Sequence, residues 1–331
     1  MTSDATLLLT RRDVASLLDL DECVAAVEEA FRLHGEARAP APGILGFPYP
    51  GGGFHIKAAG LDLSRRYFAV KVNGNYPGNP ERLALPAIQG VVVLCDGENG
   101  SPLALMDSIE ITIARTGAAT AVAARYLARR GSAVATVCGC GNQGRVQLRA
   151  LALVCPLERV DVFDADAARA ARFAQELSAE LDLDVRPTAD LSGSVRASDV
   201  CVTCTPSRGF FLRSEDVSPG TFLAAVGADS PEKQELDPRL VASAKLVADI
   251  REQCAQIGEL HHALAQGLMA VENVHAELGE IVAGKKPGRE SDAEIIVFDS
   301  TGTALQDVAA AAVVYEKAVG AGAGLRVELG T

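Results

Sequence analysis

The protein is strongly acidic, with a formal charge of −12. Basic side chains inside apolar segments therefore stand out as the first candidates for chemistry. The run "RYFAVKVNG" alternates apolar with other residues, which predicts a strand with Lys71 on one face. "GGFHIKAAG" predicts a second strand, with His55 and Lys57 on the same face. If "LDLSRR" closes a hairpin between the two strands, His55, Lys57, Ala69 and Lys71 share one face and concentrate positive charge. Alternatively, the lysines face solvent on a half-exposed sheet.

Arg115 lies in the middle of a predicted helix, "DSIEITIARTGAATAVAARYLARR", which we expect to begin at Asp107 with Glu110 completing a capping box. The residues three and four positions away are small or apolar: Ile111, Thr112, Ala118 and Ala119. A guanidinium buried on such a face is unfavourable unless it meets an anion. Arg115 therefore binds a substrate carboxylate through two parallel hydrogen bonds, or it forms an internal salt bridge to an Asp or Glu.

A glycine-rich turn, "GCGNQG", follows an apolar run and precedes a helical pattern. Gly139 permits the tight turn, Gly141 lets the backbone approach a pyrophosphate, and Gly144 brings helix and strand together. Asp164 ends the next strand roughly 20 residues further on, where a carboxylate accepts hydrogen bonds from ribose hydroxyls. We predict a dinucleotide site here that includes Asn142 and Gln143. The alternative is a turn with structural glycines and a helix-capping aspartate.

The same region bears on the choice of cofactor. A carboxylate at Asp164 repels a 2′-phosphate, and the following "ADAARA" puts no arginine immediately beside it, so NAD(H) is favoured over NADP(H). We also assign Thr116, Thr205 and Val226 to the cofactor site. Asp229 follows an apolar strand, at the edge where ligands of doubly wound sheets bind, so it could transfer protons beside the nicotinamide. Otherwise it caps the segment "SPEKQEL".

The elements around these residues predict two domains. The first part of the chain contains strand patterns flanked by helices, which indicates an α+β domain built mainly from antiparallel strands. From Gly131 onward, short β-rich runs alternate with helical patterns such as "DAARAARFAQELSAEL". This alternation indicates a doubly wound parallel sheet of the Rossmann type. The predicted fold class is therefore α/β, with an α+β substrate and dimerisation domain beside the Rossmann domain.

Composition excludes several classes of protein. The acidic balance argues against a partner that is nucleic acid or anionic lipid. No apolar run approaches the roughly 20 residues that span a bilayer, and the N-terminus lacks the layout of a secretory signal. We expect a cytoplasmic protein. We expect no metal, because Cys201 and Cys204 would point to opposite faces of a strand and no histidine pair has ligand spacing.

Several segments together resemble the ornithine cyclodeaminase/mu-crystallin family of NAD(P)-dependent proteins: "KVNGNYPGNP", "IARTGAATAVAARYLA", "GCGNQG", "AVGADSPEKQEL" and "VFDSTGTALQD". The resemblance covers nearly the whole chain. It implies a substrate-binding and dimerisation domain formed by residues 1–130 with 305–331, and a Rossmann domain formed by residues 131–304. It also implies that the protein forms a homodimer and that it binds a small amino or imino acid.

Carried over by position, the resemblance makes Lys71 and Arg115 ligands of the substrate carboxylate, with Lys71 joining in proton transfer. It makes Asp229 the acid/base of the cyclodeaminase branch. It puts "FDSTG", with Asp299 and Ser300, beside the cofactor.

Three positions depart from the family pattern. "PAPGILGF" lacks the arginine that many members have in this loop, and Ala87 stands where a threonine usually helps to hold the carboxylate. Cyclodeaminases have an acid near His55 for the distal amine of ornithine, whereas this chain offers His55 and Lys57. A lysine at this place would repel the side-chain ammonium of ornithine and attract a carboxylate.

The resulting hypothesis is an NAD(H)-dependent amino-acid dehydrogenase or imino-acid (ketimine) reductase. It would transfer hydride between the nicotinamide and the Cα of a small or acidic substrate, with iminosuccinate/aspartate as one possibility. The first alternative is an ornithine or lysine cyclodeaminase that recycles its NAD internally. The second is a non-catalytic, mu-crystallin-like binding protein, which would have no need of a proton-transfer carboxylate such as Asp229.

Overall fold

The structure is a computed structural model that describes residues 5–329. The chain divides into two compact units, one with residues up to Arg115 together with those from Thr303 onward, and the other spanning Thr116–Gly302. The first boundary lies inside helix α4 (Ile109–Leu127), whereas we predicted it at residue 130. One continuous helix contributes to both units, so no break in the sequence pattern marks the division. Within the described range, no helix is both long enough and apolar enough to cross a bilayer.

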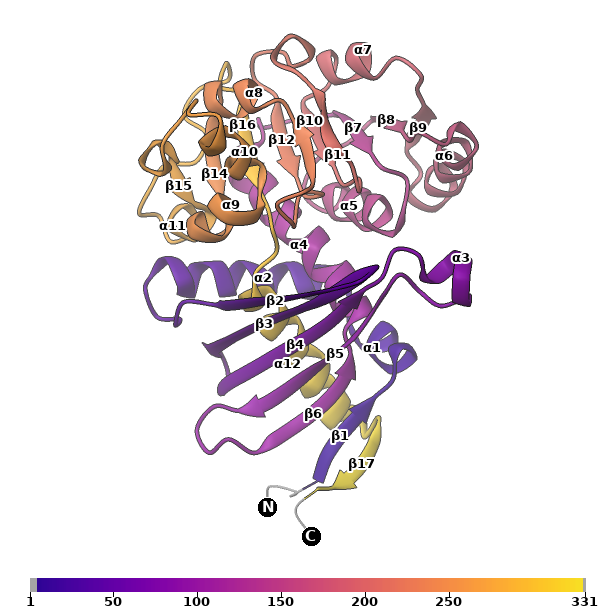
Figure 1. The fold of residues 1–331 in the computed structure, drawn as a ribbon, viewed down its shortest axis with the longest axis vertical. Helices are drawn as coiled ribbons and strands as arrows, with labels where there is room; N and C mark the ends of the chain where they lie inside the picture. Colours follow the sequence, from indigo (N-terminus) through magenta and orange to yellow (C-terminus); the bar gives the residue numbers. More distant parts are fainter. Residues whose placement is uncertain (1–4, 330–331) are drawn as a thin grey trace. The chain divides into compact units, whose positions relative to one another are not determined.

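The first unit is built on a seven-stranded sheet (Figure 1). In spatial order its strands are β17 (Leu325–Glu328), β1 (Ala5–Leu9), β6 (Pro102–Asp107), β5 (Ile88–Asp96), β4 (Arg66–Asn75), β3 (Gly52–Asp62) and β2 (Gly43–Tyr49). The pairings from β6 to β2 are all antiparallel, and β1 joins β6 in parallel. This arrangement agrees with the predicted α+β domain.

Helices cover one face of this sheet. Helix α12 (Ala304–Ala321) lies against the strands, α1 (Arg11–Leu17) contacts β1 and β6, and α2 (Leu20–Gly35) packs on α12, with the short α3 (Asn79–Leu83) in a connecting loop. Helix α12 packs against β3, β4, β5 and α2. Its sequence "ALQDVAAAAVVYEKAVGA" is rich in alanine, so its backbone can approach the strands closely. The C-terminal helix therefore completes the core of the N-terminal unit.

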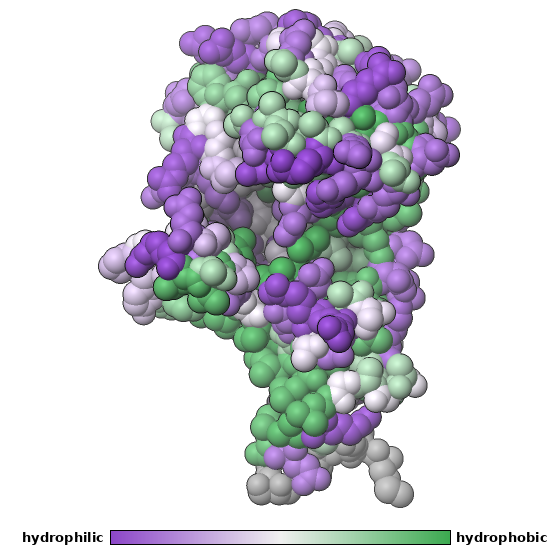
Figure 2. Space-filling model, turned by 90° about the vertical axis from the view of Figure 1, so that its right-hand side faces the viewer, coloured by the Kyte–Doolittle hydropathy of each residue, from purple (hydrophilic) through white to green (hydrophobic). Residues whose placement is uncertain are grey.

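The opposite face of the sheet is apolar, and the described residues of this unit leave it uncovered. Leu45, Ile56, Val72 and Val91 are directly paired across four neighbouring strands, and Leu45 is 59% exposed. Phe47 and Phe54 form the next cross-strand pair on the same face, because residues two apart on a strand point the same way. Figure 2 shows the apolar side chains that gather on the surface of this unit.

The second unit contains an eight-stranded sheet. In spatial order its strands are β15 (Ala276–Glu277), β14 (Lys245–Ala248), β16 (Ile296–Asp299), β12 (Phe222–Ala225), β10 (Val200–Thr203), β7 (Val134–Cys138), β8 (Arg159–Phe163) and β9 (Asp184–Pro187). All of its pairings are parallel. Counted along the chain, the first five strands have the order 3-2-1-4-5 that defines the Rossmann arrangement.

Helices and short elements connect these strands. They are α5 (Asn142–Ala152), α6 (Ala167–Leu181), α7 (Leu191–Arg196), α8 (Pro238–Ser243), α9 (Arg251–Ile257), α10 (Glu259–Ala265) and α11 (Leu278–Val282), with a two-stranded sheet of β11 (Arg208–Leu212) and β13 (Gln234–Leu236). Strands β10, β12 and β16 are buried along their whole length, as expected for a parallel sheet covered on both faces. The predicted doubly wound α/β fold is confirmed.

The helix that carries Arg115 begins later than the capping-box pattern predicts. Asp107 is the last residue of β6, and α4 starts at Ile109. The Asp107 carboxylate still accepts a hydrogen bond from the Ile109 amide at 2.9 Å. Strand pairing holds Asp107 in the sheet, so the prediction placed the helix start two residues too early.

Candidate active site

The hairpin that we predicted from alternation is present. In the antiparallel register of β3 and β4, Lys57 is paired with Lys71, Ala59 with Ala69, and His55 with Asn73. Directly paired residues point to the same face, so the prediction that His55, Lys57, Ala69 and Lys71 share a face is confirmed. The alternative in which both lysines face solvent is wrong, because α12 covers this face and Lys57 and Lys71 are 9% and 3% exposed.

Lys71 and Arg115 meet at a carboxylate from α12. Lys71 Nζ lies 2.7 Å from Asp307 Oδ1, and Arg115 Nε lies 3.0 Å from the same oxygen. Arg115 Nη1 donates a further hydrogen bond to Gln306 Oε1 at 2.8 Å, and Lys71 Nζ lies 3.4 Å from Thr112 Oγ1. Arg115 therefore forms the internal salt bridge that we considered as an alternative to binding a substrate carboxylate. A guanidinium has five N–H donors, so these contacts do not use all of them.

Positive charge exceeds negative charge in this buried cluster. The charges of Lys57, Lys71 and Arg115 all act on the single carboxylate of Asp307. Burial raises the pKa of Asp307, but the three cations outweigh that effect and the net shift is downward. Burial lowers the pKa of Lys71 to about 7, with Arg115 and Lys57 acting in the same direction and Asp307 opposing them. An anion bound here would balance the charge, and Lys71 can exchange a proton near neutral pH.

Asp307 and Gln306 are site residues that reasoning from the sequence missed. Both are 1% exposed and lie in the first turn of α12. The signal was present in "TGTALQD", where an acid and an amide directly precede the apolar run "VAAAAVV". Charged residues are rarely fully buried unless they are paired, so a buried position for Asp307 would have implied a basic partner.

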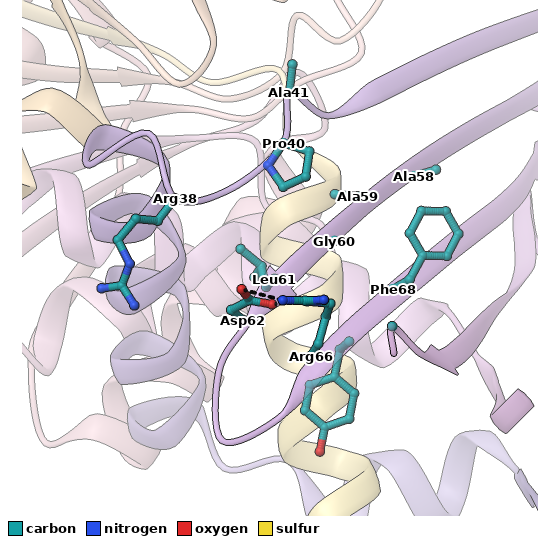
Figure 3. Close-up of a pocket in the computed structure, with 12 residues that line it drawn as sticks. Arg38, Pro40, Ala41, Ala58, Ala59, Gly60, Leu61, Asp62, Arg66 and Phe68 are labelled. Atoms are coloured by element: carbon teal, nitrogen blue, oxygen red, sulfur yellow. Dashed lines mark hydrogen bonds and ion pairs between the residues drawn. The ribbon is translucent and has the colours of Figure 1, made fainter. Parts of the chain in front are cut away.

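A separate cavity of about 440 Å³ lies in the same unit, at the end of β3 (Figure 3). Its charged residues are paired with other side chains: Arg66 Nε lies 2.6 Å from Asp62 Oδ1, and Arg38 Nη1 lies 3.1 Å from Glu36 Oε2. None of the residues Lys57, Lys71, Arg115 and Asp307 lines it. Because its charges are balanced, this cavity is a poorer site for an anionic substrate than the buried cluster.

The glycine turn in the second unit has the geometry of a phosphate cradle. Gly139 has φ +107°, which favours glycine. A Cβ added to Gly144 would lie 2.0 Å from the Gly139 carbonyl oxygen, so only glycine fits between turn and helix. A Cβ added to Gly141 would meet nothing within 4 Å. Gly141 is the N-cap of α5 and lacks a side chain, so open space lies over the first turn of the helix, which begins with Asn142 and Gln143.

Asp164 holds this turn in place. Its carboxylate accepts hydrogen bonds from the Cys140 amide at 2.9 Å and from the Asp166 amide at 2.9 Å. Arg169 Nη1 lies 3.5 Å from Asp164 Oδ1. Our expectation that no arginine lies immediately beside Asp164 is therefore wrong. Helix α6 begins at Ala167, and its first turn brings Arg169 back to the carboxylate although the two residues are five apart in sequence.

A buried acid, Glu235, organises the strand ends next to the glycine turn. Its Oε1 accepts hydrogen bonds from the Thr205 amide at 2.6 Å and the Thr205 hydroxyl at 2.7 Å, while Oε2 accepts from Thr203 Oγ1 at 2.7 Å and the Gly227 amide at 2.9 Å. Burial raises the pKa of Glu235. Val226 is half-buried between these loops. Thr205 and Val226 thus lie at the carboxyl edge of the sheet, and Glu235 is a further residue that we did not predict.

Asp299 and Ser300 end β16 at the same edge. Asp299 is fully buried and accepts hydrogen bonds from the Glu259 and Leu260 amides at 3.1 and 2.9 Å, so it caps α10. Burial raises its pKa to about 7. Among the residues that the structure describes, the buried atoms Ser300 Oγ and Gln143 Oε1 have no hydrogen-bond partner. Both side chains were predicted to contact the cofactor, and a polar ligand would supply the missing partners.

Asp229 lies in the loop after β12 and is exposed. Lys233 Nζ lies 2.6 Å from its Oδ1. Asp229 therefore pairs with a residue of the segment "SPEKQEL", while its predicted part in proton transfer stays a prediction. Thr116, the other predicted cofactor residue, is 7% exposed within α4.

Possible metal ligands do not cluster in the described part of the chain. Between residues 5 and 329, no group of three or more His, Cys, Asp or Glu side chains could hold a metal ion. Cys201 is buried in β10 and Cys204 follows that strand, and all eight cysteines are free thiols. Burial raises the pKa of Cys204 well above its ordinary value. The Cys204 thiol is therefore a poor ligand and nucleophile.

Comparison with known proteins gives consistent matches over most of the chain. The chain is 41% identical over 324 residues to an alanine dehydrogenase from Archaeoglobus fulgidus, with 98% of both proteins covered. Among solved structures, an archaeal alanine dehydrogenase dimer with bound NAD has a TM-score of 0.94 at 41% identity, covering 98% of this chain and 99% of that one. The iminosuccinate reductase of Paracoccus denitrificans in complex with NAD⁺ has a TM-score of 0.90 at 34% identity, covering 98% and 100%. The model of the ornithine cyclodeaminase/mu-crystallin family matches residues 4–322, and the chain belongs to that family.

Proposed function

We propose that the protein is an NAD(H)-dependent amino-acid dehydrogenase or imino-acid reductase acting on a small or acidic substrate. The observation that carries this proposal is the buried cluster in which Lys57, Lys71 and Arg115 face the single carboxylate of Asp307. Buried charge of one sign is unfavourable unless an ion of the opposite sign compensates it. A substrate carboxylate is such an ion, and both similar enzymes have names that denote chemistry at an amino or imino acid.

The residues of this cluster divide the work of holding the substrate and moving its proton. Arg115 binds the substrate carboxylate through its remaining N–H donors, because a guanidinium matches a carboxylate in a two-point contact. That contact fixes the orientation of the substrate Cα. Lys71, with a pKa of about 7, donates a proton to the imine nitrogen in the reductive direction and accepts one from the amine in the oxidative direction. Asp229 is a second candidate for this proton transfer.

The glycine turn fits a dinucleotide. The open space at Gly141 and the unpartnered Gln143 Oε1 and Ser300 Oγ would receive it, and Asp164 would meet the ribose. When bound, NAD(H) supplies the hydride acceptor or donor. Asp164 favours NAD(H) over NADP(H), although Arg169 beside it weakens the repulsion of a 2′-phosphate. The two similar solved structures contain NAD.

The protein acts as a homodimer in this proposal. The uncovered apolar face of the first unit, with Leu45, Phe47 and Phe54 exposed, is of the kind that pairs with a second copy. The alanine dehydrogenase with the similar structure is described as a dimer.

The test is a panel of 2-oxo acids, each supplied with ammonia or methylamine, in which NADH oxidation is followed by absorbance. We expect turnover with pyruvate or oxaloacetate, faster with NADH than with NADPH, and loss of turnover in Lys71→Met. A parallel assay with ornithine and NAD measures ammonia and proline. Ammonia and proline without accumulation of NADH would establish cyclodeamination instead, and silence in both assays would indicate a binding protein.

A further inference from the structure

Asp307 connects the two cations that the proposed chemistry needs. Its Oδ1 lies 2.7 Å from Lys71 Nζ on β4 and 3.0 Å from Arg115 Nε on α4. The residue before it, Gln306, binds Arg115 Nη1 at 2.8 Å. Two consecutive residues of α12 therefore contact the Arg115 guanidinium, Gln306 through a hydrogen bond and Asp307 through an ion pair, while one Asp307 oxygen lies between Arg115 and the Lys71 amine.

We propose that Asp307 is a positioning residue, which holds Lys71 and Arg115 at the spacing required by a substrate's nitrogen and carboxylate and keeps Lys71 able to carry a proton. This inference rests on the proposed function. Asp307 acts through the two cations and needs no contact with the substrate. Helix α12 comes from the C-terminal end of the chain, so the site of the N-terminal unit is incomplete without it.

The surroundings of Lys71 give Asp307 this role. Lys57 lies beside Lys71 in the register on β3, and Arg115 approaches from α4. On the other neighbouring strand, β5, Lys71 is paired with the uncharged Val92. Burial raises the pKa of Cys23 on α2 to about 12, while the charges of Arg115 and Asp307 act on it in opposite directions. Its thiol therefore stays neutral. Of the charges acting on Lys71, those of Arg115 and Lys57 favour its neutral form, and that of Asp307 favours its protonated form.

Removal of the Asp307 charge therefore has a defined consequence. An opposite charge within about 4–6 Å shifts a pKa by about 1–3 units, and burial makes the site sensitive to that charge. In Asp307→Asn the pKa of Lys71 falls below its value of about 7. Less of the amine is then protonated at neutral pH, and reduction, which needs that proton, slows there.

The first experiment compares the pH dependence of kcat for imine reduction in the wild type and in Asp307→Asn. In the pH profile of kcat, we expect the limb that reflects the pKa of Lys71 to move to lower pH by about 1–3 units. The variant should lose activity at neutral pH and recover part of it in mild acid, and KM for NADH should stay unchanged. The matched control is Glu316→Gln, which removes a different carboxylate of α12, one that accepts a hydrogen bond from Tyr67. This variant should keep the wild-type pH profile.

The second experiment reads the pKa of Lys71 without turnover. The chain has seven lysines, so its ¹³C-lysine NMR spectrum is simple, and Lys71→Met assigns the signal. We expect the pKa of Lys71 to be lower in Asp307→Asn. In Lys57→Met, which removes a repelling charge and leaves Asp307 in place, it should be higher. This second variant provides the test if Asp307→Asn does not fold.

The outcomes separate this inference from the proposed function. If the pKa of Lys71 is unchanged or higher in Asp307→Asn, or lower in Lys57→Met, the inference is overturned. It is also overturned if that pKa falls while the pH profile of an active enzyme stays in place. If the wild type turns over no member of the panel, the proposed function fails, yet a lower pKa in Asp307→Asn still establishes Asp307 as the residue that keeps Lys71 protonated.

Discussion

Lys57 is the residue that most clearly distinguishes this cluster from a site that would bind a single substrate carboxylate. In the proposed site, Lys71 and Arg115 provide two cations for one substrate carboxylate, and Asp307 neutralises part of their charge. Lys57 adds a third positive charge from the neighbouring strand, and it is 9% exposed. A second acidic group on the substrate would add a favourable interaction with this charge. We therefore expect Lys57 to influence which imino acid is preferred.

Lys57→Met should lower kcat/KM for oxaloacetate with ammonia, relative to pyruvate with ammonia, by about 10- to 100-fold. Hydrogen bonds to charged groups contribute about 1.5–3 kcal/mol, and methionine keeps the volume of the side chain while removing its charge. Steady-state kinetics with both substrates measures the ratio. Lys317→Met removes a lysine from α12 that is paired with Asp19 and Glu22, and it should leave the ratio unchanged. An unaltered ratio in Lys57→Met would rule out a role in choosing acidic substrates.

At the scale of elements, the glycine turn and the start of α5 form one structural unit, in which the glycines have different roles. Gly144 is needed for packing, because a Cβ there would lie 2.0 Å from the Gly139 carbonyl oxygen. Gly141 has φ −91° and open space around its Cα, so the fold alone does not require glycine there. We therefore expect the requirement at Gly141 to come from the ligand that would approach it.

The variants Gly144→Ala and Gly141→Ala should therefore differ. Gly144→Ala should destabilise the protein by about 1–3 kcal/mol, because the helix must move away from the turn. Gly141→Ala should unfold at the same urea concentration as the wild type, yet bind NADH at least about tenfold more weakly, since a methyl group occupies the phosphate cradle. Urea unfolding and NADH fluorescence titration provide the two measurements. Wild-type affinity in Gly141→Ala would mean that no phosphate lies over this turn.

The buried acids at the carboxyl edge of the parallel sheet determine how stability depends on pH. The pKa of Asp299 rises from 3.8 to about 7, and burial raises the pKa values of Glu235 and Glu259 as well. A raised pKa means that the folded state holds the proton more tightly than the unfolded state does. The contribution of these acids to the free energy of unfolding therefore decreases as pH rises from about 4 to about 7.

We expect the urea midpoint to fall over that pH range, and Asp299→Asn to flatten the fall. The amide cannot accept both hydrogen bonds from the start of α10, so the variant should be less stable by about 1–3 kcal/mol in mild acid. The difference from the wild type should narrow as pH rises. Asp184→Asn, at an exposed ion pair with Arg186, is the control. A variant with the wild-type pH slope would exclude Asp299 as the titrating group.

At the scale of the whole molecule, the seven-stranded sheet presents one face to α12 and leaves the other uncovered. Leu45, Ile56, Val72 and Val91 form a continuous apolar row on the uncovered face. Exposed rows of this kind are unfavourable in water, so a monomer would be prone to associate. A second copy is the simplest partner because a two-fold axis pairs the same surface with itself.

Leu45→Glu should convert the proposed dimer to a monomer, because it would place two charges close together in an apolar interface. Light scattering after size-exclusion chromatography gives the mass directly. Leu153→Glu, at a leucine that is 51% exposed in the second unit, should leave the mass unchanged. If Leu45→Glu still elutes as a dimer, the interface lies elsewhere on the protein.

The sequence by itself determined the elements whose pattern is local. The alternation around Lys57 and Lys71 predicted their shared face, since side chains on a strand alternate with a fixed period. The glycine spacing predicted the turn between β7 and α5, because the backbone conformation at Gly139 and the close contact at Gly144 tolerate only glycine. The alternation of strands and helices predicted the parallel sheet.

Tertiary structure alone decided which charges meet. Asp307 is 236 residues from Lys71 in sequence, and no local pattern predicts their 2.7 Å contact. The start of α4 at Ile109 and the approach of Arg169 to Asp164 also depended on the pairing of a strand and the turn of a helix. Local periodicity specifies which face of an element is buried. The partner of a buried charge depends on packing between distant segments, and burial then sets its pKa.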